Sequence, residues 1–173
     1  MIVAEGHTDR LLTEEDVREL ATEALGRTEL DSKRVLVIIP DSTRTAPVPL
    51  LFRLLHEILW DRVKALDYLV ALGTHPLMSE DALNAHLGVT AEDRATKYEG
   101  IRVFNHHWDL EEACVSIGTI SRKEIEDVTG GLLSQDLPVT VNHLIFDYDQ
   151  LIICGPVFPH EVAGFSGGTK YFF

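Results

Sequence analysis

The chain has 173 residues, a length that a single domain normally fills. Its hydrophobic fraction of 45% and charged fraction of 25% are too apolar for a disordered chain and too interrupted for a membrane span. Fifteen Lys and Arg against 28 Asp and Glu give a net charge of −13, which repels phosphate backbones. Composition therefore predicts one globular domain and argues against nucleic-acid and membrane partners.

The cysteines and the N-terminus indicate the cellular compartment. Cys114 and Cys154 do not form a CxxC pair, and the N-terminal segment Met-Ile-Val-Ala-Glu-Gly-His lacks the basic and apolar blocks of a secretory signal. We therefore expect a cytoplasmic protein.

Helical and extended patterns alternate along the chain. Thr13, followed by acidic residues, predicts a helix that ends at Gly26. The apolar run 34–39 before Pro40 is typical of a strand buried on both faces, and parallel pairing is then expected. The same reasoning predicts a helix over 50–59, a strand over 66–72 ended by Gly73, a helix between Ser79 and Gly88, strands over 101–105 and 151–154, and a helix or a strand over 144–148.

This alternation predicts an α/β fold with a mostly parallel sheet and helices on both faces, a Rossmann-like three-layer domain. Strand residues such as Val37, Ile38, Leu69 and Val70 should be buried in it. In sheets of this kind ligands bind beyond the carboxyl ends of the strands, so we expect the ligand-binding residues in the segments that follow the strands.

The loop after the first strand carries Asp41 and Arg44 among prolines. Arg44 could hold a carboxylate through two parallel hydrogen bonds. The alternative is an Asp41–Arg44 ion pair that only stabilises the loop.

The loop after the second strand carries His75 between Gly73 and Pro76. An imidazole titrates near pH ~6.5 and can both accept and return a proton at neutral pH. His75 is therefore a candidate acid–base group, although a single loop histidine can also be an ordinary surface residue.

The segment 155–170 after the last predicted strand is the most informative one. Its glycines, including Gly164, Gly167 and Gly168, free backbone N–H groups to cradle an anion, and Lys170 supplies a charge or a nucleophilic amine. The spacing differs from that of a Walker A loop, because Thr169 precedes Lys170. The alternative is a flexible glycine turn with a solvated lysine.

Three motifs in this order, Asp41-Ser-Thr-Arg44, Gly73-Thr-His75 and 160–170 (His-Glu-Val-Ala-Gly-Phe-Ser-Gly-Gly-Thr-Lys), resemble the N-terminal domain of the nickel-dependent lactate racemases. The resemblance runs from about Val35 to Lys170, and Ala163-Gly-Phe-Ser-Gly-Gly168 is its most distinctive stretch.

The resemblance implies a nickel-pincer nucleotide cofactor and a 2-hydroxy acid substrate. It implies that Lys170 tethers the cofactor, that His75 and His160 are the acid–base pair, and that Arg44 orients the substrate carboxylate, with Asp41 also at the substrate. Ser166, Gly167 and Gly168 would lie near the cofactor. The C2 hydrogen would leave as a hydride and return on either face, which makes the domain part of an isomerase.

The chain also departs from the family pattern. Thr45 and Ala46 separate Arg44 from the next proline, Pro76 follows His75, and Thr169 precedes Lys170, which points to a different 2-hydroxy acid or a polyol acid as substrate. Residues 1–173 would be the single N-terminal domain. The nickel-ligating histidine and the C-terminal domain are expected downstream, so that this chain alone is expected to hold no metal and to be inactive.

Two other functions stay open at this point. A non-catalytic relative could use Arg44, His75 and the glycine segment only to hold a carboxylate or a nucleotide phosphate. A zinc hydrolase is less favoured, because no pair of histidines has the close spacing of zinc ligands.

Overall fold

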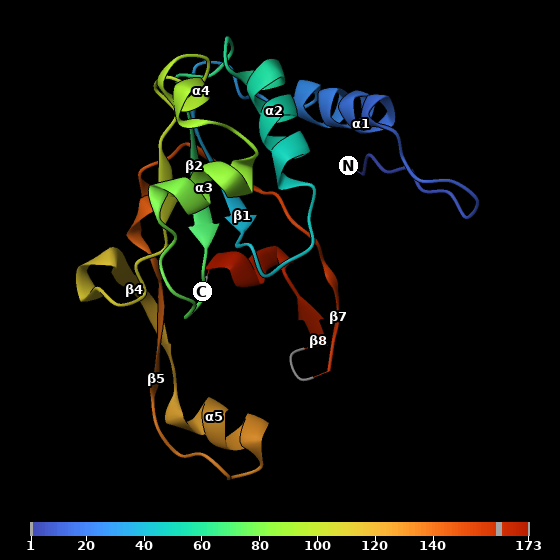
Figure 1. Ribbon diagram of the computed structural model, residues 1–173. Coiled ribbons are helices and arrows are strands. Elements are labelled where there is room, and N and C mark those ends of the chain that lie inside the picture. Colours follow the sequence, from blue (N-terminus) through green and yellow to red (C-terminus); the bar gives the residue numbers. More distant parts are fainter. Residues whose placement is uncertain (1, 162–163, 173) are drawn as a thin grey trace.

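A computed structural model describes residues 2–161 and 164–172 (Figure 1). In chain order the α-helices and strands are α1 (Glu14–Gly26), β1 (Arg34–Pro40), α2 (Val48–Leu59), β2 (Ala65–Ala71), α3 (Glu80–Leu87), α4 (Ala91–Ala95), β3 (Val103–Asn105), β4 (Cys114–Ile120), α5 (Arg122–Thr129), β5 (Leu137–Asn142), β6 (Gln150–Ile153), β7 (Phe158–His160) and β8 (Gly164–Ser166). The 3₁₀ helices are η1 (Glu111–Ala113), η2 (His143–Phe146) and η3 (Gly168–Phe172).

The main sheet has the strand order β3-β2-β1-β6, and each neighbouring pair is parallel. The chain builds outward from β1 through β2 to β3 and then returns to add β6 on the other side of β1. Strand order therefore reverses beside β1, which is where parallel sheets of this type bind ligands. The predicted α/β, Rossmann-like class is confirmed.

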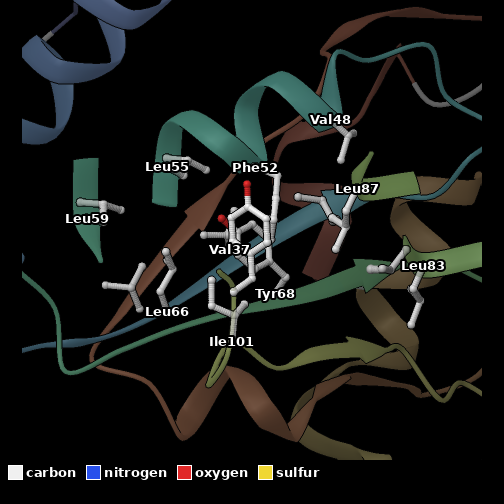
Figure 2. Packing of buried hydrophobic residues seen from close by; sticks show 14 of the residues in the cluster. Val37, Val48, Phe52, Leu55, Leu59, Leu66, Tyr68, Leu83, Leu87 and Ile101 are labelled. Atoms are coloured by element: carbon white, nitrogen blue, oxygen red, sulfur yellow. The ribbon is translucent and has the colours of Figure 1, made fainter. Parts of the chain in front are cut away.

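One face of the sheet packs against α2 and α3 (Figure 2). The ring of Phe52 on α2 lies 4.9 Å from the ring of Tyr68 on β2, centroid to centroid, and 4.8 Å from that of Tyr98. The other face is covered by the 3₁₀ helices η2 and η3 rather than by α-helices, with Tyr171 and Phe172 against the cluster around Ile38.

The predicted elements are confirmed, with shifts of a few residues at their ends. Thr13 and Asp16 form a capping box at the start of α1, and Gly88 ends α3 with a φ of 68°. The ambiguous segment 144–148 contains most of η2, a 3₁₀ helix. The strand residues expected in the core, Val37, Ile38, Leu69 and Val70, are no more than 2% exposed.

Two parts of the structure were not predicted from the sequence. β4, α5 and β5 form an arm that projects from the main sheet, and β7 pairs with β8 in a short antiparallel hairpin (Figure 1). Among the residues that the structure describes, no helix has the length and apolar character needed to cross a membrane.

Candidate functional site

A cleft of about 270 Å³ lies beyond the carboxyl ends of β1 and β2. Its walls come from the loops after these two strands and from the segment that runs from the end of β8 into η3. The lining includes six residues that the sequence singled out: Asp41, Arg44, His75, Ser166, Gly167 and Lys170. The register explains why the two loops meet, because Pro40 at the end of β1 lies opposite Ala71 at the end of β2.

Asp41 is the buried member of the cleft, with a side chain 6% exposed. Its Oδ1 accepts hydrogen bonds from the Thr43 hydroxyl at 2.6 Å and from the Thr43 backbone N–H at 3.1 Å. Its Oδ2 bonds to Nδ1 of His75, whose side chain is 51% exposed. Burial disfavours ionisation of Asp41, but the bonds from Thr43 and His75 outweigh it and lower the pKa of this carboxyl.

The backbone of His75 is fixed at both of its polar groups. Its N–H donates to the Leu72 carbonyl at 3.0 Å, and its carbonyl accepts from Nε1 of Trp108 at 2.9 Å. The turn that places it includes Gly73 at a φ of 58°, a conformation that favours glycine. The backbone of His75 is thus fixed by the residue after β2 on one side and by the indole of Trp108 on the other.

Arg44 and Lys170 are exposed cations at the cleft. Neither forms an ion pair with a residue in the described ranges, 2–161 and 164–172. Arg44 touches Asp41 only through its backbone N–H, which donates to the Asp41 carbonyl at 3.3 Å. The alternative of a loop-stabilising Asp41–Arg44 ion pair is therefore wrong, and two unpaired positive charges face one cleft of an acidic chain.

The glycine segment is packed so closely that side chains would not fit at two positions. A Cβ on Gly167 would lie 2.0 Å from the Pro156 carbonyl oxygen, and one on Gly155 would lie 2.8 Å from the Tyr171 ring. Ser166 is 3% exposed, and its Oγ has no hydrogen-bond partner in the part of the chain that the structure describes. A buried hydroxyl without a partner is costly, so this atom at the cleft wall is suited to a ligand.

His160 and Gly168 are sequence-predicted site residues outside the cleft lining. His160 lies on β7, where it pairs with Gly164 of β8, and its Nδ1 is 3.8 Å from the Glu161 carboxylate. Gly168 begins η3. Of the three residues expected to converge on one cleft, Arg44 and His75 line it, and His160 is not among the lining residues. Ala163, in the most distinctive stretch, lies outside the described residues.

Sequence reasoning missed Thr43, Trp108 and Tyr171. Thr43 had a readable signal, because Asp followed two residues later by a hydrogen-bond donor after a strand is the pattern of an Asx turn. Trp108 and Tyr171 had none, since their contacts with His75 and Gly155 depend on segments far apart in the chain.

Among the described residues, no three His, Cys, Asp or Glu side chains group as a metal site. His106 instead bonds to Asn142 through Nδ1 at 2.9 Å, and His107 lies 3.5 Å from Asp109.

Comparisons with known proteins agree with the fold and the motifs. A crystal structure of a protein from Thermotoga maritima superimposes with a TM-score of 0.81 and 31% identity, over 93% of this chain and 37% of that chain. The chain thus spans little more than a third of that protein. No curated protein matches it. The family model described as the lactate racemase N-terminal domain matches residues 10–173, and the chain belongs to this family.

Proposed function

We propose that this cleft is the substrate- and cofactor-binding half of an active site that racemises or epimerises a 2-hydroxy acid. The observation that carries the proposal is the meeting of Arg44, His75 and Lys170, from three separate segments, in one cleft of a lactate racemase N-terminal domain. Because the chain spans 37% of its structural relative, the reaction would belong to a longer protein whose further domain completes the site.

Arg44 would bind the substrate carboxylate. Its guanidinium can form two parallel hydrogen bonds with a carboxylate, and no acidic side chain among the described residues competes for it. The cleft volume of about 270 Å³ suits a small acid. A substrate held at one end can turn its other end, which a change of configuration at C2 requires.

His75 would accept the proton of the substrate hydroxyl and return it. A second base on the opposite side of C2 serves the other enantiomer, and the family resemblance assigns this role to His160. The assignment of His75 is supported by its place in the cleft beside Arg44. The assignment of His160 rests on the motif alone.

The residues present fit the nucleotide cofactor that the family implies. The Ser166 hydroxyl is buried and needs an acceptor, Gly167 admits no side chain, and the amine of Lys170 is exposed in the same cleft. Lys170 would hold the cofactor covalently and Ser166 would donate to one of its polar oxygens. When bound, a nickel-pincer nucleotide supplies an acceptor for the hydride from C2.

The covalent link separates this function from simple anion binding. In the full-length protein, produced together with the cofactor-making proteins, intact-mass analysis should show a nucleotide-sized adduct on the wild type and none on Lys170→Arg. Arginine keeps the positive charge but cannot form the link. Lys123→Arg, on α5 of the arm, is the matched control and should keep the adduct.

Activity is measured by chiral chromatography after each enantiomer of lactate or of a larger 2-hydroxy acid is supplied alone. Arg44→Lys should raise KM about tenfold to a hundredfold, because a bidentate contact with a charged group is lost. A wild-type protein with neither adduct nor activity would reject the proposal and favour a non-catalytic domain that holds a carboxylate or a phosphate.

A further inference from the structure

We propose that Asp41, held by Thr43, is a positioning residue that keeps the ring proton of His75 on Nδ1 and so presents an unprotonated Nε2 to the cleft. The inference rests on the proposed function and deepens it. It assigns Asp41 to the histidine rather than to the substrate, where the family resemblance had placed it.

The carboxylate of Asp41 is occupied by neighbouring residues at the cleft wall. Both of its carboxylate oxygens are engaged, Oδ1 by two donors of Thr43 in the same loop and Oδ2 by the imidazole of His75 in the loop after β2. Pro40, the preceding residue, is held in turn, because its carbonyl accepts a bond from Nε2 of His86 at 2.8 Å. The carboxylate therefore stands at a rigid strand end, as a group that orients another side chain should.

The hydrogen bond to Asp41 determines which ring nitrogen of His75 carries the proton. An ionised carboxylate can only accept hydrogen bonds, so the ring nitrogen that faces Oδ2 must carry a hydrogen. Nδ1 is that nitrogen, and a neutral imidazole has only one N–H. Nε2 is left with its lone pair, which is the form that accepts a hydroxyl proton.

Asp41→Asn tests this directly, because Thr43 determines how the amide turns. Two Thr43 donors meet Oδ1 and a single donor of His75 meets Oδ2, so the amide oxygen should stay at Thr43 and the amide NH₂ should face His75. Nδ1 must then accept, and the ring proton moves to Nε2. The substitution changes the tautomer while the shape of the side chain is kept.

The readout is the pair of ring ¹⁵N shifts of His75 in long-range ¹H–¹⁵N spectra of the 173-residue chain near neutral pH, assigned with His75→Gln. Wild type should show a protonated Nδ1, and Asp41→Asn a protonated Nε2. His86 is an internal reference with the opposite tautomer, because its Nε2 faces a carbonyl that can only accept. Asp67→Asn, a buried carboxylate near the other end of β2, is the matched control and should leave His75 unchanged.

Thr43→Val provides a second variant that retains the carboxylate. It removes one of the two bonds to Oδ1, so the ring proton should stay on Nδ1 while the His75 resonances broaden. In the loaded full-length enzyme, Asp41→Asn should lower kcat at least tenfold with KM changed less than about threefold, because Arg44 binds the substrate independently.

A wild-type His75 protonated on Nε2, or an Asp41→Asn chain with the wild-type tautomer, overturns the inference whether or not the enzyme is a racemase. A rise in KM without a change of tautomer would also overturn it and make Asp41 a substrate ligand. The expected tautomer change in a protein without racemase activity would support the positioning role of Asp41 and refute only the proposed function.

Discussion

Replacing Gly167 with alanine should destabilise the chain more than the same change at the next residue, Gly168. Both glycines have positive φ angles, 75° and 59°, so alanine is strained at either position. Their surroundings differ. A Cβ on Gly167 would lie 2.0 Å from the carbonyl oxygen of Pro156, whereas one on Gly168 would lie 3.6 Å from the nearest atom, a methyl of Val157.

The expected magnitudes follow from these two contributions. Forcing an L-residue into the left-handed region costs about 1–2 kcal/mol, which is the whole expected effect at Gly168. At Gly167 a collision is added, and overpacking costs about 1–3 kcal/mol more. The colliding atom belongs to the backbone and cannot swing aside. We therefore expect Gly167→Ala to cost about 2–5 kcal/mol, a large share of a typical stability of about 5–15 kcal/mol.

Urea unfolding of the two variants and the wild type, followed by circular dichroism, measures the difference. Gly168→Ala is the matched control, since it lies in the same turn and carries the same backbone strain. Equal costs within about 0.5 kcal/mol, the usual scatter of such comparisons, would refute the close approach of Pro156 to Gly167. The position of Ser166 and Lys170 in the cleft would then be in error too.

Two further predictions concern the sheet. Val37→Ala removes methyl groups from a fully buried position and should cost about 1–3 kcal/mol in urea unfolding. Val128→Ala, on the exposed face of α5, is the control and should change stability by less than about 0.5 kcal/mol. Equal effects would refute the core assignment of β1. Hydrogen bonds from Arg34 lower the pKa of Asp149 to about 2, from about 3.8 in an unfolded chain. The contribution of Asp149 to stability is therefore present above pH ~4 and is lost as the pH falls toward 2. The stability difference between wild type and Asp149→Asn should therefore disappear over this range in urea midpoints measured against pH, and a difference that persists at pH 2 would contradict the ion pair.

The central sheet could be predicted because its sequence signals are strong and local. β1 and β2 are buried on both faces, so β1 appears as an apolar run that ends at Pro40, and β2 as a mostly apolar run, interrupted by Asp67, that is closed by Gly73. Helix α1 begins with a capping box, which is readable within four residues. Such signals need no knowledge of the rest of the fold.

The arm and the hairpin lacked signals of this kind. β4 is exposed along most of its length, so burial imposes no clear alternation on it, and β7 and β8 are three residues each. Helix α5 is different. Ser121 and Glu124 form a capping box and Gly130 ends the helix with a φ of 62°, so the rule that found α1 could have found α5 as well.

The partners of the site residues could not be read from the sequence, although their location could. A parallel sheet brings the loops after β1 and β2 to one edge, whatever those loops contain. Which groups pair there is decided by competition among donors. Asp41 had Arg44, Thr43 and His75 within reach of its loop, and the Asx turn with Thr43 together with the bond to His75 fills both oxygens.

The charge of the cleft depends on which group pairs with Asp41. Had Asp41 paired with Arg44, the carboxylate would have neutralised the guanidinium, and a substrate acid would have had to displace it. Because the local turn satisfies Asp41 instead, the positive charge of Arg44 stays available beside that of Lys170. In a chain with a net charge of −13, this is how one cleft can attract an anion that the rest of the surface repels. The same three-residue turn that orients His75 thereby keeps the binding site for the carboxylate open.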